Sequence, residues 1–163
     1  MVKTPIWQKG YEMRVYLVIV DDSEEAGTAL RFAARRASKT DGIVHLLALV
    51  PPQPFQAFSA IQATIEEEAR SRAEALANSA AASIAVAGGR TPAITLREGD
   101  PVKAIRAYLE DHPEVAALVL GAARDSAQGP LVTYFAGAGL GTLPCPLFLV
   151  PGGLSDAEID RVS

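Results

Sequence analysis

Two short apolar segments of the sequence each end at residues suited to binding a ligand. The segment 15–20 ends at Asp21, whose carboxylate can accept hydrogen bonds from a ring amine or a ribose hydroxyl, and the segment 115–120 ends at Gly121. A glycine lets a ligand approach the backbone closely. If both segments are strands of one parallel sheet, their carboxyl ends open onto the crevice where open α/β sheets bind ligands. Because Asp is also a common turn or capping residue, both interpretations of Asp21 stay open.

The loop after the second segment carries groups suited to an anion. Arg124 supplies a cation, Ser126 and Thr133 supply hydroxyls, and Gly129-Pro130 starts a predicted helix, whose first N–H groups have no partner within the helix. The same composition is typical of an ordinary surface loop. The sequence has no G-x-G-x-x-G and no Walker-type phosphate motif, so phosphate binding and a plain loop both remain open.

The remaining reactive side chains favour structural roles. His45 lies inside an apolar run and is expected as a core or edge histidine, whereas His112 precedes Pro113 in a helix-capping position. The single cysteine, Cys145, is expected as a buried structural thiol. Two histidines and one cysteine do not make a His/Cys zinc centre, so no metal site is expected. Ser23 lies outside any G-x-S-x-G motif, and we expect no catalytic residue.

Strand-like and helix-like segments alternate along the chain. The candidate strands are nearly continuous in apolar residues, which is typical of strands covered on both faces of a parallel sheet. They span residues 14–20, 43–50, 93–97, 115–120 and 147–150. This alternation predicts an α/β fold with one doubly wound, five-stranded parallel sheet, helices on both faces and right-handed crossovers.

Helix signals lie between and after these strands. Ser23 is a plausible N-cap of the first helix, Asp100-Pro101 starts the third, and Ser155 with Glu158 forms a capping box for a short final helix. The fourth helix is expected from Gly129-Pro130 to Leu143. The second is expected to end at Gly88-Gly89 and to carry an apolar face made of Phe58, Ile61, Ile65, Ala69, Leu76 and Ile84.

Composition bounds the class of protein. The chain has 163 residues and is 49% hydrophobic, which fits one domain with a sizeable core. We divide it into an N-terminal extension (1–12) without the apolar segment of a secretory signal, an α/β domain (13–152) and a C-terminal tail with a short helix (153–163). A net charge of -4 with scattered Lys and Arg argues against nucleic-acid binding. The uncharged segment 129–155 holds prolines that argue against a membrane span, and the single cysteine fits a cytoplasmic location.

The segment Val18-Ile19-Val20-Asp21-Asp22-Ser23-Glu24-Glu25, with the segments 46–50, 97–101, 118–121 and 145–151, resembles universal stress proteins over nearly the whole domain. The resemblance implies a Rossmann-like, adenine nucleotide alpha hydrolase-like sheet in a cytoplasmic stress-response protein. It also implies a homodimer formed through the strand 147–150 and, as in many members, an ATP or AMP site, with Mg²⁺ if ATP is bound. On this resemblance, Asp21 would meet the adenine or ribose, Leu49 would flank the adenine, and Leu120 and Gly121 would adjoin the ribose.

The phosphate end departs from the family pattern. Asp22 replaces a Gly, Arg124 replaces the second Gly of G-x-x-G, and Thr133-Tyr134 or Tyr134-Phe135 stands where Gly-Ser belongs. Either Arg124, Gly129 and Thr133 form a rearranged phosphate cradle, or this branch has lost strong ATP binding. The leading hypothesis is a dimeric, adenine-nucleotide-responsive module without conventional catalysis. The alternatives are a dimeric interaction protein with a vestigial crevice and, more weakly, a slow ATPase.

Overall fold

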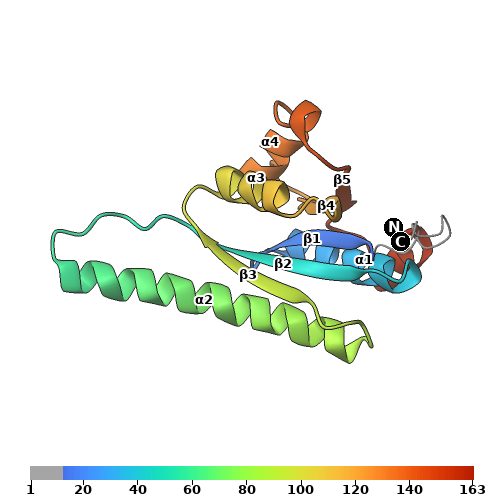
Figure 1. Ribbon diagram of the computed structural model, residues 1–163, viewed down its shortest axis with the longest axis horizontal. Helices are drawn as coiled ribbons and strands as arrows, with labels where there is room; N and C mark the ends of the chain where they lie inside the picture. Colours follow the sequence, from blue (N-terminus) through green and yellow to red (C-terminus); the bar gives the residue numbers. More distant parts are fainter. Residues whose placement is uncertain (1–12) are drawn as a thin grey trace, which may run out of the picture.

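The protein is built on one parallel sheet, which Figure 1 shows from the side. The computed structural model describes residues 13–163, so the predicted extension 1–12 lies outside the described residues. The five strands run in the order β3-β2-β1-β4-β5, and each neighbouring pair is parallel. They are β1 (Val15–Val20), β2 (Ile43–Val50), β3 (Ala93–Glu98), β4 (Val115–Ala122) and β5 (Leu147–Pro151).

Helices cover both faces of this sheet, as expected for a doubly wound fold. One face carries α1 (Glu24–Lys39) and α2 (Ser59–Val86), and the other carries α3 (Pro101–Asp111) and α4 (Pro130–Phe135) (Figure 1). The predicted α/β fold with a five-stranded, doubly wound sheet is therefore confirmed.

The alternation of side chains along β1 shows how the two layers are held. Val15, Leu17 and Ile19 pack with α3 and α4, whereas Tyr16 and Val18 pack with α1. All five side chains are buried, because a central parallel strand has helices on both sides. This accounts for the unbroken apolar run in the sequence.

The final helix, α5 (Asp156–Val162), begins with the predicted capping box. The hydroxyl of Ser155 accepts from the N–H of Glu158 at 3.3 Å, and the Glu158 carboxylate accepts from the N–H of Ser155 at 2.8 Å. Ile159 is fully buried, and Arg35 of α1 forms an ion pair with Asp160 at 2.8 Å. The segment expected as a tail is thus packed against α1.

The fourth helix is shorter than the sequence predicts. It ends at Phe135 rather than at Leu143, and the chain continues through turns into a 3-10 helix, Leu140–Thr142. The cause is local, since the N–H groups of Gly137 and Gly139 both return to the carbonyl of Tyr134. Gly139 also lies against the Tyr134 ring, where a Cβ would come within 2.9 Å of three ring atoms. Gly137 and Gly139 therefore form the tight turns that end the helix.

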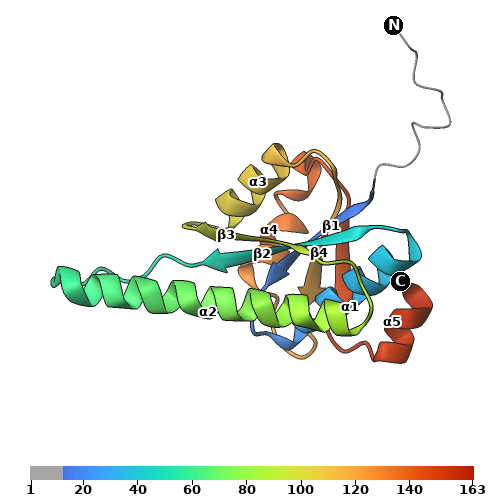
Figure 2. The same cartoon turned by 60° about the horizontal axis from the view of Figure 1, so that its bottom comes forward.

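Only the part of α2 from Ala69 onward packs on the sheet. Ala69, Ala73, Ala77, Ala80 and Ile84 are buried at helical spacing. The part of the helix before Ala69 extends beyond the end of the sheet, as both views show (Figures 1 and 2), and Phe58, which precedes its first residue, is 72% exposed. The predicted apolar face is wrong for Phe58 and Ile61. The predicted end is confirmed, because Gly88 has φ +79° just after the last turn.

Among the helices of residues 13–163, none has the length and apolarity of a membrane span.

Candidate functional site

A cavity of about 570 Å³ opens at the carboxyl ends of β1, β2 and β4. It lies at the point where the sheet order reverses, because the connections from β1 lead one way to β2 and β3, whereas β4 and β5 lie on the other side of β1. Such switch points are the usual ligand sites of open α/β sheets. Five of the seven predicted site residues line it: Asp21, Leu49, Leu120, Gly121 and Gly129.

The turn that carries Asp21 into the cavity wall is built by local hydrogen bonds. One carboxylate oxygen of Asp21 accepts from the N–H of Ser23 at 2.7 Å, and the hydroxyl of Ser23 accepts from the N–H of Ala26 at 3.2 Å as the N-cap of α1. Asp21 is exposed and also lines the cavity. The turn interpretation of Asp21 is therefore observed, since one carboxylate oxygen closes the turn, whereas ligand binding by the second oxygen stays a prediction.

Gly121 lies against the first turn of α1. A Cβ atom at this position would overlap the carbonyl group of Glu25 and come 2.9 Å from the Glu25 Cβ. Gly152 shows the same crowding, since its Cβ would lie 3.0 Å from the Glu25 Cβ and 2.8 Å from the Ala122 carbonyl oxygen. The glycine at 121 is thus required for α1 to sit close to β4, and this packing brings Asp21 and Gly121 into one wall.

Arg124 and Thr133 do not line the cavity. The Arg124 guanidinium pairs with Asp125 at 3.4 Å, and the Thr133 hydroxyl lies 3.4 Å from the carbonyl oxygen of Gln128. The amide of Gln128 holds the loop together, accepting from the N–H of Ala123 at 2.7 Å and donating to the carbonyl of Ala123 at 2.9 Å. The side chain of Gln128 thus pairs with the backbone of Ala123 as a neighbouring strand would. The sequence spacing does not indicate this role of Gln128.

Sequence reasoning missed Arg72, which reaches the cavity from α2. It lies beside Ala69, Ala73 and Leu76, the residues through which the middle of this helix meets the sheet and the cavity. The sequence does carry a signal, because Arg72 follows Ala69 by three residues, a spacing that places two side chains on the same face of a helix.

The charge of the cavity lining is strongly unequal. Its acidic residues are Asp21, Asp22, Glu25 and Asp100, and among its lining residues in the described part of the chain Arg72 is the only basic one. The Asp100 carboxylate is partly engaged as the N-cap of α3, accepting from the N–H of Lys103 at 2.9 Å. The cavity therefore presents apolar walls with several hydrogen-bond acceptors and a single cation.

The family model described as "Universal stress protein family" matches residues 13–151 of this sequence. The chain belongs to the universal stress protein family. This confirms the resemblance seen in the sequence, and a comparison with curated proteins found no match.

Solved structures of universal stress proteins share the fold. The UspA protein of Lactobacillus plantarum has a TM-score of 0.72 at 19% identity, over 86% of this chain and 99% of that one. A universal stress protein solved in complex with cAMP has a TM-score of 0.59 at 16% identity, over 84% and 96%. The protein of Archaeoglobus fulgidus in complex with dAMP has a TM-score of 0.59 at 18% identity, over 85% and 98%.

Proposed function

We propose that this universal stress protein binds an adenine mononucleotide in the cavity at the carboxyl edge of the sheet, and that it acts as a nucleotide-responsive module of the cytoplasm rather than as an enzyme. The observation that carries the proposal is the meeting of Asp21, Leu49 and Gly121 around one cavity. Its volume of about 570 Å³ falls in the range of about 300–1,000 Å³ that holds small ligands. Relatives of the same fold in complex with cAMP and dAMP support the choice of ligand.

Each wall of the cavity suits one part of such a ligand. Leu49 offers an apolar surface and strand backbone to the flat base, and Leu120 with Gly121 offers a shallow wall for the ribose. The Asp21 carboxylate can accept from a ribose hydroxyl or the exocyclic amine, because an ionised acceptor forms the stronger type of hydrogen bond. Arg72 is the cation available to a phosphate.

The charge balance favours a ligand with few phosphates. Four carboxylates against one guanidinium repel a triphosphate more than a monophosphate. If ATP is the ligand, Mg²⁺ must accompany it to neutralise the phosphate charge. We therefore expect AMP to bind more tightly than ATP alone, with Mg²⁺ reducing the difference.

Isothermal titration with AMP, ADP, ATP and ATP with Mg²⁺ tests the proposal. Arg72→Gln is expected to weaken AMP binding about ten-fold or more, since a hydrogen bond to a charged group contributes about 1.5–3 kcal/mol. Arg70→Gln is the matched control, because Arg70 pairs with Glu74 and Glu98 and does not line the cavity. Absence of heat above dilution at millimolar nucleotide, in protein with native circular dichroism, rejects nucleotide binding.

A second candidate function is that of a dimeric interaction protein whose crevice is vestigial. It is favoured by the position of β5 at the edge of the sheet, where Leu149 is 42% exposed, although Val150 is buried within its own chain. An open strand edge readily pairs with another chain, so both candidates include a homodimer through residues 147–150. A dimer that gives no nucleotide heat favours this second function.

A further inference from the structure

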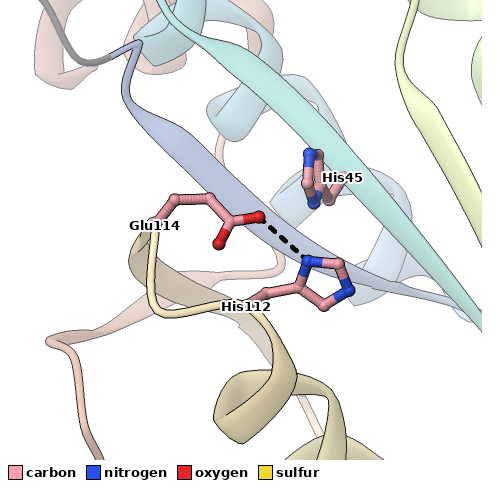
Figure 3. A group of neighbouring side chains, drawn as sticks. All are labelled: His45, His112 and Glu114. Atoms are coloured by element: carbon pink, nitrogen blue, oxygen red, sulfur yellow. Dashed lines mark hydrogen bonds and ion pairs between the residues drawn. The ribbon is translucent and has the colours of Figure 1, made fainter.

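The only two histidines of the sequence meet at the amino edge of the sheet, opposite the cavity. His45 is the third residue of β2, His112 caps the end of α3, and Glu114 immediately precedes β4. Figure 3 shows the three side chains turned toward one another from these separate elements. One ligand atom from each side chain lies within 4.8 Å of those of the other two.

Two polar contacts hold this arrangement. Nδ1 of His112 lies 2.9 Å from a carboxylate oxygen of Glu114, the contact dashed in Figure 3, and Nδ1 of His45 lies 2.8 Å from the hydroxyl of Tyr108. The Tyr108 ring also stacks on the His112 ring, with centroids 4.1 Å apart. A buried tyrosine thus fixes the positions of both imidazoles, as outer residues do around metal ligands.

We propose that His45, His112 and Glu114 form a binding site for a divalent transition-metal ion such as Zn²⁺, with water completing the coordination. Two imidazoles and one carboxylate are a ligand set that suits such ions. Ligands about 2.0–2.1 Å from a tetrahedral Zn²⁺ lie about 3.3 Å from one another, so small side-chain rotations close the site around an ion. A bound ion would replace the proton between Nδ1 of His112 and the carboxylate of Glu114.

The surroundings keep the ligands accessible and ready to bind. The side chains of His112 and Glu114 are 32% and 45% exposed, so a hydrated ion can reach them. Burial lowers the pKa of His45, and the neighbouring His112 lowers it further. The hydrogen bond from His112 lowers the pKa of the Glu114 carboxyl.

The proposed site departs from the expectation of no metal drawn from the sequence. The number of histidines and cysteines in the sequence does not indicate that β2 brings His45 beside the end of α3. A bound ion would tie β2 to the connection between α3 and β4. Because the site lies at the edge opposite the nucleotide cavity, its test is independent of the proposed function.

The experiment is a Zn²⁺ titration of the full chain without an affinity tag, followed by calorimetry and by metal content after dialysis. One Zn²⁺ per chain is expected. His112→Gln or Glu114→Gln should weaken binding at least about 10- to 100-fold, the loss seen when even outer residues of metal sites are replaced. Glu110→Gln is the matched control, because Glu110 is an exposed carboxylate of α3 outside the cluster and should leave affinity unchanged.

A second readout uses thermal unfolding with Zn²⁺ and with a chelator. Zn²⁺ should raise the melting temperature of the wild-type protein and of Glu110→Gln, but not that of Glu114→Gln. The Glu114 side chain is 45% exposed, so its replacement should leave the protein folded. Equal Zn²⁺ affinity in wild type, His112→Gln and Glu114→Gln overturns the proposal. So does the absence of Zn²⁺ binding by the folded wild-type protein at millimolar Zn²⁺.

Discussion

The backbone of Gly121 at the end of β4 lies directly against Glu25 in the first turn of α1, with no room for a side chain between them. Gly121→Ala should therefore push α1 away from β4 and lower the free energy of unfolding by about 1–3 kcal/mol, the usual cost of overpacking. Chemical denaturation measures the change. Gly141→Ala is the control, because nothing lies within 4 Å of the added Cβ. Equal stability of the two variants would contradict the packing described for Gly121.

Thr28 should be sensitive to loss of its hydroxyl. Among residues 13–163, Thr28 is the one polar side chain that is fully buried. Its hydroxyl donates to the carbonyl of Gly152 at 2.9 Å. Thr28→Val keeps the shape but leaves that carbonyl unpaired, which costs about 1–3 kcal/mol. Thermal and denaturant unfolding measure this. The exposed Thr64, whose hydroxyl bonds only within α2, gives the control Thr64→Val, and a cost as large there would show that the Gly152 contact is not responsible.

Cys145 should react slowly with thiol reagents in the folded protein. Burial raises the pKa of its thiol, so less thiolate is present near pH 7 than for a free cysteine. Because it is the single cysteine of the sequence, the rate of a chromogenic disulfide reagent reports on it alone. The rate should rise as pH is raised toward the pKa, and unfolding should restore the rate of a free thiol. Cys145 is half-buried rather than fully buried as the sequence predicts, and a folded-state rate equal to the unfolded one at pH 7 would contradict this partial shielding.

The fold followed from the sequence because its strands are buried on both sides. A strand such as β1 must be apolar at every position, and that pattern stands out from helical periodicity. The ends of elements were less predictable. The turns at Gly137 and Gly139 end α4, because the N–H groups of both glycines bond to the carbonyl of Tyr134. The low helix propensity of glycine does not by itself indicate where these turns form.

The candidate site was predictable where one residue follows a strand and unpredictable where it depends on how elements pack. Asp21 and Gly121 stand out in the sequence because they lie at the carboxyl ends of two apolar segments, and both line the cavity. Arg72 was not, since its place in the cavity depends on how α2 crosses the end of the sheet. The meeting of His45 with His112 likewise depends on the packing of α3 against β2.

The edge strand β5 gives a direct test of the proposed homodimer. Leu149→Lys places a charge at the exposed position of this edge and should convert the dimer to a monomer, because charged side chains block edge pairing. Light scattering coupled to size exclusion measures the mass. The control Val162→Lys adds the same charge on α5, where Val162 is 50% exposed. A dimer that survives Leu149→Lys would place the contact elsewhere.

The central claim is that an adenine nucleotide binds at the carboxyl edge of the sheet. Its most direct test is a titration of isotopically labelled protein with AMP, followed by backbone amide chemical shifts. We predict that the shifts change around Asp21, Leu49, Gly121 and Arg72 and stay constant around His45 at the opposite edge. Unchanged shifts at saturating AMP, or changes confined to the His45 edge, would contradict the claim.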